Sequence, residues 1–145
     1  MNFPVFDLHC DSALALLGED MNSAGSLRKN DLHIDLERAK ELPGYCQCFA
    51  CFTTPDMEQW AKTSPVVIFE RELATIQREL DKNKRLMSIA YSVEDIRRNT
   101  EKGKMSAILT LEGTAGFGYD PELLEDLFVV EEVFDKSRPT PVPEM

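Results

Sequence analysis

Four apolar runs of strand length recur along the chain, separated by more polar segments. These runs are residues 3–8, 45–52, 86–91 and 105–111. The run 45–52 is almost wholly apolar or small, so both of its faces are expected to be buried, as in a parallel sheet covered by helices. Because helical segments separate the runs, the pattern is typical of βαβ units. It predicts an α/β fold with about four parallel strands that alternate with helices.

The predicted helices carry recognisable capping residues. The clearest begins at Ser64, whose hydroxyl can cap the helix, with Pro65 at the first helical position. Its apolar positions recur at spacings of four, three and four residues: Phe69, Leu73, Ile76 and Leu80. The charged positions of the same helix are expected to form a solvated face: Glu70, Arg71, Glu72, Arg78 and Glu79. Ser92 is expected to cap a shorter helix over 93–102 that stops at Gly103.

Shorter segments complete the predicted order of elements. A short helical turn is expected from Ala13 to Leu17, and Asp35 can cap a short helix that ends before Pro43. Asp120, followed by proline, is expected to open a last helix. The inward positions of that helix would be Leu123, Leu124, Leu127 and Phe134. The sequence shows no internal repeat.

The domain organisation follows from length and from the composition of the last residues. A chain of 145 residues is long enough for one domain that buries a core of its own, which we place at residues 1–135. Residues 136–145 contain three prolines at every second position, which prevents both a helix and a central strand. We expect this tail to be extended and poorly ordered.

Charge and hydropathy exclude several classes of partner. The net charge of -10 disfavours a phosphate-dominated interface, so nucleic acid is rejected as the main partner. No apolar segment approaches the roughly eighteen residues of a membrane-spanning helix, and the N-terminus does not resemble a signal peptide. We therefore expect no membrane partner and a cytoplasmic location.

Candidate metal ligands follow two of the predicted strands. His9 and Asp11 come after the first run and are two positions apart, so on a strand they would project to the same side. Glu112 ends the last run. Parallel strands bring their C-terminal ends to one rim, where α/β barrels place their chemistry. Imidazole nitrogen and carboxylate oxygen both bind divalent metals such as zinc, although an uncomplicated polar strand end would show the same residues.

The cysteines offer an alternative site. Cys46, Cys48 and Cys51 are closely spaced within one apolar run. Free cysteine is among the most buried residue types, so small buried side chains in a strand are the favoured interpretation. A zinc or redox site built on these thiols is the competing one. A disulfide framework is not expected in a cytosolic chain of this size.

Several motifs considered together resemble a known family. They are residues 6–12 (FDLHCDS), 33–39 (HIDLERA), 103–105 (GKM) and 109–113 (LTLEG). Their order and separations resemble those of the membrane dipeptidase (renal dipeptidase) family, zinc peptidases within the amidohydrolase superfamily of (β/α)8 barrels. The resemblance covers about residues 3 to 128.

The resemblance implies a metal-dependent peptidase site. Members of the family hydrolyse small dipeptides, including some with a D-residue at the C-terminal side, at a centre of two zinc ions. His9 and Asp11 fall on the ligands of one zinc, and Glu112 falls on the carboxylate that bridges both. Gln47 lies in a strand segment of the family and is assigned only a structural role. The substrate-binding residues stay unknown.

The chain also departs from the family. Complete members carry further histidine ligands beyond the bridging glutamate, whereas this chain has only His9 and His33. A (β/α)8 barrel needs about 250 residues, so the resemblance implies a partial TIM barrel, the N-terminal half only. We expect one zinc ion or none, and weak or no hydrolysis by the isolated chain, which is either truncated or a genuinely short form. A non-catalytic α/β module with a vestigial metal site is the alternative. Exposed sheet edges could cause self-association.

Overall fold

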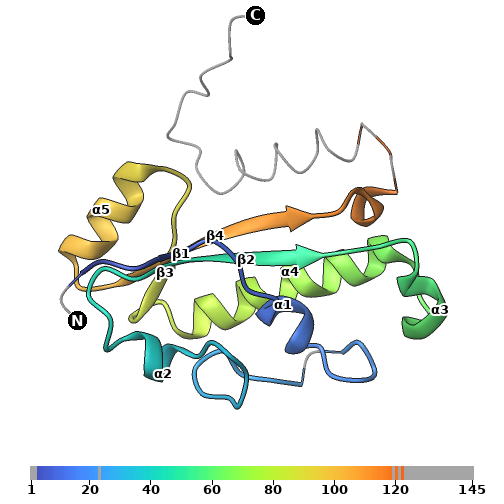
Figure 1. Ribbon diagram of the computed structural model, residues 1–145, viewed down its shortest axis with the longest axis horizontal. Coiled ribbons are helices and arrows are strands. Elements are labelled where there is room, and N and C mark those ends of the chain that lie inside the picture. The colour runs from blue at the N-terminus through green and yellow to red at the C-terminus, as the bar shows by residue number, and fades with distance from the viewer. Residues whose placement is uncertain (1–2, 23, 119, 121, 123–145) are drawn as a thin grey trace, which may run out of the picture.

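The described part of the computed structural model comprises residues 3–22, 24–118, 120 and 122. Within it, a four-stranded parallel sheet has the order β1-β2-β4-β3 (Figure 1). The strands are β1 (Phe6–Asp7), β2 (Cys46–Phe52), β3 (Met87–Ile89) and β4 (Met105–Glu112). The prediction of an α/β fold with about four parallel strands is confirmed. The expected last helix after Asp120 and the boundary between residues 135 and 136 lie outside the described residues.

The helices alternate with the strands, as the hydrophobic pattern predicts. They are α1 (Ser12–Ala15), α2 (Leu36–Ala39), α3 (Met57–Ala61), α4 (Pro65–Lys82), α5 (Val93–Glu101) and the 3-10 helix η1 (Thr114–Phe117). The predicted caps are present, because Asp35, Ser64 and Ser92 each accept a hydrogen bond from a backbone N–H three residues further on. The short helix α3 is not among the elements that the sequence pattern predicts.

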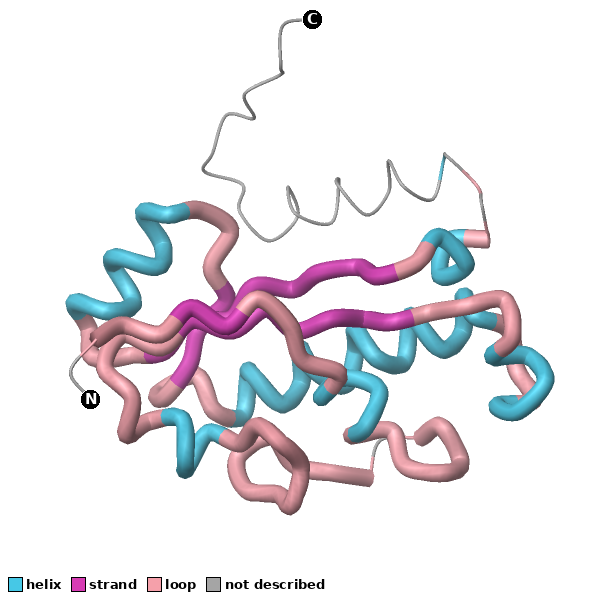
Figure 2. Tube along the Cα trace, in the orientation of Figure 1, coloured by secondary structure: helices cyan, strands magenta, loops and turns pink. Residues whose placement is uncertain are grey.

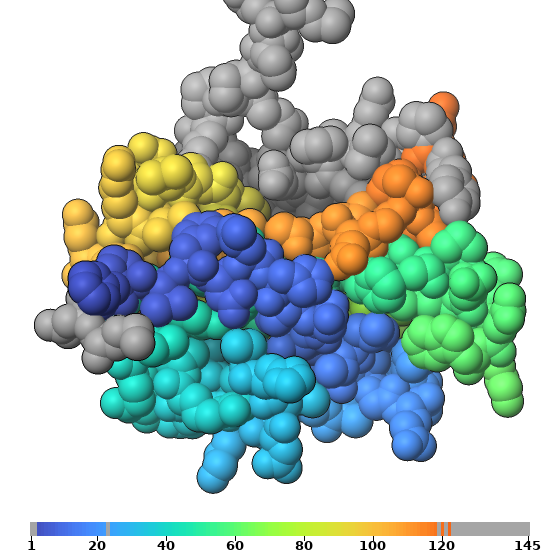
Figure 3. Space-filling model, viewed as in Figure 1, coloured from blue at the N-terminus to red at the C-terminus, as the bar shows by residue number. Residues whose placement is uncertain are grey.

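Two strands are shorter than their apolar runs. β1 contains only Phe6 and Asp7, and β3 only residues 87–89. The backbone of the first segment nevertheless continues its pairing with β2, since the Cys46 N–H donates to the Val5 carbonyl and the Cys10 N–H to the Cys48 carbonyl. This N-terminal segment runs along the outside of the molecule, between the segments that contain α2 and α5 (Figure 3).

The strand order places helices on both sides of the sheet (Figure 2). The connection from β2 to β3 passes β4, and the connection from β3 returns to β4 in the opposite direction. Right-handed crossovers in opposite directions leave their helices on opposite faces of a parallel sheet. Accordingly, α4 lies on the same side as α1 and α2, whereas α5 lies on the other (Figure 1).

The main core lies between the sheet and α4. Phe49 and Cys51 of β2 and Ile76 and Leu80 of α4 are buried there. Leu109 and Leu111 of β4 pack against the same cluster. This arrangement confirms the predicted burial of the 45–52 run. Residues 45–51 are buried, and Phe52 at the end of the run is partly exposed.

The charged face predicted for α4 is partly wrong. Glu72 is 0% and Glu79 2% exposed, although both were expected in solvent. The reason is that α4 is covered on a second side by the segment that follows β1. Glu79 accepts a hydrogen bond from the Leu27 backbone N–H and pairs with Lys82. The spacing of apolar residues within one helix does not reveal a second segment that packs against that helix.

Candidate metal centre

Three side chains from the ends of two strands come together at the C-terminal rim of the sheet. His9 and Asp11 follow β1, and Glu112 is the last residue of β4. The His9 Nε2 atom lies 3.1 Å from Asp11 Oδ1 and 3.6 Å from Glu112 Oε2. Within the described residues this is the group of possible metal ligands that the structure brings together, with all ligand atoms within 4.8 Å of one another. We refer to His9, Asp11 and Glu112 as the rim triad.

The parallel pairing of the sheet explains this convergence. β1 and β4 are the two neighbours of β2, so their C-terminal ends lie on either side of the same strand. Hydrogen bonds continue past the strand ends: the Ala50 N–H donates to the Cys10 carbonyl (3.0 Å), and the Thr53 N–H donates to the Glu112 carbonyl (2.9 Å). The backbone at Cys10, between His9 and Asp11, and the backbone of Glu112 are thereby held against β2 and the residue that follows it.

Gly113 allows the end of β4 to lie this close to the segment after β2. Its φ of 90° is in the region that favours glycine. A Cβ atom built on Gly113 would lie 2.0 Å from the Thr53 carbonyl oxygen. No side chain fits there. This role of Gly113 was not predicted, although a glycine directly after a carboxylate at the end of a strand is a signal visible in the sequence.

Buried hydrogen bonds fix β1 at the base of the site. The Gln47 side chain is fully buried, and its Nε2 atom donates to the Cys48 carbonyl at 2.9 Å and to the Asp7 carbonyl at 3.4 Å. The Tyr45 hydroxyl donates to Gln47 Oε1. Burial holds the pKa of Tyr45 above its usual range, so this hydroxyl remains a donor at neutral pH. These contacts fit the structural role assigned to Gln47.

The chemistry of the rim triad suits a divalent cation. One imidazole and two carboxylates are nitrogen and oxygen donors that zinc accepts. Ligands about 2.1 Å from a tetrahedral zinc ion lie about 3.4 Å apart. The separations of His9 Nε2 from Asp11 Oδ1 and from Glu112 Oε2, 3.1 and 3.6 Å, bracket that value. The side chains are 52%, 61% and 49% exposed in the order His9, Asp11, Glu112, so solutes can reach them.

Glu72, which was expected on the solvated face of α4, is a buried acidic residue near the rim. Both carboxylate oxygens are buried, and neither has a hydrogen-bond partner among the described residues. Burial, together with the negative charge of Asp11, raises the pKa of Glu72 to about 8. This carboxyl group is therefore mostly protonated and uncharged at neutral pH.

The cysteines and the second histidine do not form a site. All four thiols are free and buried. Burial raises the pKa of Cys46 to about 11 and that of Cys51 to about 12, which keeps these thiols protonated. Cys51 also faces the opposite side of β2 from Cys46 and Cys48, because side chains alternate along a strand. Among the described residues, neither a cysteine nor His33, which is exposed, belongs to a group of possible metal ligands.

The parallel sheet, its helices and the polar cluster at its C-terminal rim define a part of a TIM-barrel-like α/β protein. The sequence profile of the membrane dipeptidase family (Peptidase family M19) matches residues 1–129. The chain therefore belongs to this family of metallopeptidases, which confirms the resemblance found in its motifs. No protein with a curated description matches the chain.

Solved structures share the fold. A metallo peptidase from Rhodobacter sphaeroides, liganded with a phosphinate mimic of the dipeptide L-Ala-D-Ala, is 19% identical with a TM-score of 0.68; the match covers 90% of this chain and 44% of that one. The probable dipeptidase PvdM from Pseudomonas aeruginosa is 20% identical with a TM-score of 0.64, over 87% and 32% of the two chains. The dipeptidase AC, an M19 metallo peptidase, is 17% identical with a TM-score of 0.65, over 90% and 42%.

These matches confirm a partial barrel. The chain spans less than half of the length of each of the three solved structures. At sequence identities below 25%, these matches establish the fold alone.

None of the helices in the described ranges is long and apolar enough to cross a membrane.

Proposed function

We propose that the protein contributes the first half of a zinc-dependent dipeptidase site, in which His9, Asp11 and Glu112 bind a single zinc ion. The observation that supports this is the convergence of three ligand atoms within 4.8 Å at the C-terminal rim, on a chain of the M19 family. A zinc ion bound there would polarise the scissile carbonyl and activate a water molecule.

The residues of the chain perform three tasks in this proposal. The carboxylates of Asp11 and Glu112 attract the cation, and the His9 imidazole supplies a neutral nitrogen ligand through Nε2. The hydrogen bonds from Ala50 and Thr53 hold the two strand ends at a fixed separation. Exposure of about half of each triad side chain leaves the site open to a small substrate.

The proposed substrate class is a small dipeptide. This assignment is supported by family membership and by the dipeptide mimic bound to the Rhodobacter sphaeroides metallo peptidase.

A non-catalytic module with a vestigial metal site is the second candidate. It is favoured by the ligand count, because three donors among the described residues suit one ion and not two. In this version zinc binds at the rim triad but dipeptides are not hydrolysed.

Zinc binding by the purified chain tests the metal site. Isothermal titration should give about one equivalent of zinc for the wild-type protein. Glu112→Gln and His9→Ala should abolish binding, whereas Glu58→Gln and His33→Ala, which change exposed residues outside the triad, should leave it unchanged. Binding that survives in both triad variants would reject the proposed site.

Hydrolysis of a dipeptide panel separates the two candidates. With zinc present, weak activity that disappears in His9→Ala and persists in His33→Ala would support the peptidase. Zinc binding at the triad without triad-dependent hydrolysis would support the non-catalytic module. The paired histidine variants also exclude a contaminating peptidase, because contamination would not distinguish them.

A further inference from the structure

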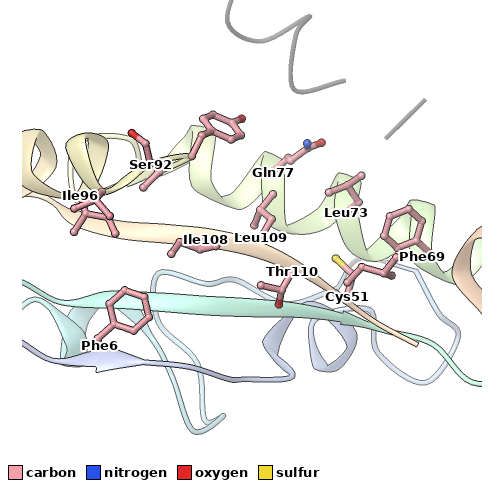
Figure 4. Close-up of a pocket in the computed structure, with 14 residues that line it drawn as sticks. Phe6, Cys51, Phe69, Leu73, Gln77, Ser92, Ile96, Ile108, Leu109 and Thr110 are labelled. Atoms are coloured by element: carbon pink, nitrogen blue, oxygen red, sulfur yellow. The ribbon is translucent and has the colours of Figure 1, made fainter. Parts of the chain in front are cut away.

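An apolar groove of about 440 Å³ lies beside β4, and no member of the rim triad lines it. One wall is formed by Phe69, Leu73 and Gln77 on α4, and another by Val93 and Ile96 of α5. The floor consists of β4 residues 108–111 (Figure 4). We call this cavity the β4 groove.

The groove coincides with an unpaired stretch of β4. β3 pairs only with Met105–Ala107, and no described strand pairs with residues 108–112 on that side. Met105 and Ala107 direct their backbone groups toward β3, as the hydrogen bonds to Leu86 and Ala90 show. Since this direction alternates along a parallel strand, Leu109 and Leu111 direct theirs into the groove. Proteins usually cover an apolar cavity that lies along an unpaired strand edge, here residues 108–112 of β4, with another segment or a partner.

We propose that the β4 groove is the docking site of the chain's own residues 123–134. Described residues continue past β4 through η1, which packs against α4, to Glu122. The chain therefore leaves the described structure beside the same helix that forms one wall of the groove. A further 23 residues follow, according to the 145-residue sequence.

The sequence of this segment suits the groove in pattern and in length. Eight of its twelve residues are apolar, and four of these recur at spacings of four, three and four: Leu123, Leu127, Val130 and Phe134. Val130 takes the place of Leu124 in the set of inward positions expected from the sequence. This spacing is typical of one helix face, and four acidic residues are interspersed, at positions 125, 126, 131 and 132. Twelve residues in a helix extend about 18 Å, whereas Phe69 to Gln77 on α4 extends about 12 Å. The segment is long enough to cover the groove.

Charge and tethering favour the chain's own segment over a second copy. Each chain carries a net charge of -10, so two copies repel one another. A segment attached through Glu122 is present at an effective concentration on the order of millimolar, without any association step. We therefore infer intramolecular cover.

Photo-crosslinking in the full-length protein tests this inference. The photoreactive residue p-benzoylphenylalanine replaces Leu127 in the apolar stripe or, as a matched control, Val129 outside it. Crosslinks from position 127 should map to residues 69–77, 91–96 or 108–111 and should leave the protein at monomer mass. Position 129 should give fewer crosslinks to these peptides. Crosslinks at dimer mass would assign the groove to a second copy, and crosslinks elsewhere would overturn the proposal.

Hydrogen exchange with point variants provides a second measurement. Leu127→Asp should increase exchange at the Leu109 and Leu111 amides and increase binding of a dye for apolar surfaces several-fold. Val129→Asp, which introduces the same charge in the same segment, should change neither. Equal effects of the two substitutions, or none from either, would contradict docking through the Leu127 stripe. Because neither readout involves zinc or dipeptides, failure here is distinguishable from failure of the proposed function.

Discussion

At the level of single residues, Gly113 connects the backbone of the fold to the geometry of the metal centre. It permits the turn after Glu112 and the contact with the Thr53 carbonyl. A methyl group there would separate the end of β4 from the segment that follows β2. The carboxylate that precedes Gly113 would move with it, so the residue influences a site that it does not contact.

We predict that Gly113→Ala lowers both stability and zinc affinity. The steric overlap and the positive φ together should cost more than about 1 kcal/mol of the free energy of unfolding. Urea unfolding and zinc titration measure the two effects. Gly103→Ala is the matched control, because Gly103 also has a positive φ (68°) but a methyl group added there would meet nothing within 4 Å. It should lose some stability and keep its zinc affinity; equal affinity losses in both variants would contradict the explanation.

Glu72 should make stability depend on pH. In the folded chain its pKa is raised from 4.5 to about 8, so the folded state retains a proton that the unfolded state releases. Stability should therefore fall as pH rises from 4.5 toward about 8. Each unit of difference in pKa corresponds to about 1.4 kcal/mol.

We predict that Glu72→Gln raises the free energy of unfolding at alkaline pH by a few kcal/mol, because the amide never ionises. The gain should vanish below about pH 4.5, where the carboxyl is protonated in both states. Urea unfolding across this pH range measures it. Glu70→Gln, at an exposed position of the same helix, should leave the pH profile unchanged. A pH-independent effect of Glu72→Gln would contradict the assigned protonation.

At the level of elements, α4 depends on its N-terminal cap. The Ser64 side chain accepts a hydrogen bond from the Val67 N–H, and Pro65 fills the first helical position. Ser64→Ala should lower the free energy of unfolding by about 1 kcal/mol, as measured by urea denaturation. Ser64→Asp keeps an acceptor at the same position and should retain most of the stability. Similar losses in both variants would show that the hydroxyl does not act as a cap.

Local sequence signals predicted the helices and strands, but they did not predict which elements pack against one another. Capping residues and apolar spacing identified α4 and α5. Because parallel strands have their C-terminal ends at one rim, the sequence also predicted that His9, Asp11 and Glu112 lie close together. The burial of Glu72 and Glu79 was missed because it depends on a second segment packed against α4. The placement of β4 between β2 and β3 was not predicted, since no local pattern specifies strand order.

At the level of the whole molecule, zinc bound at the rim triad should stabilise the folded state by linking β1 to β4 across β2. The rim triad combines residues that are far apart in sequence, and a ligand that binds only the folded state stabilises it. Zinc at about 100 times its dissociation constant should add about 2.7 kcal/mol to the free energy of unfolding. Thermal unfolding with and without zinc measures this. Glu112→Gln should show no gain, and a gain equal to that of the wild-type protein would place the binding elsewhere.

The central position of β4 also has a consequence for biosynthesis. β2 and β3 share no hydrogen bonds, and β4 joins them with a register in which Cys46 pairs with Ser106. A ribosome must therefore deliver residues up to Glu112 before the sheet can close, and until then the apolar surface of β2 has no strand on one side. Pairings this distant in sequence form slowly, so we expect the emerging chain to expose this apolar surface for a time and to be a substrate for chaperones.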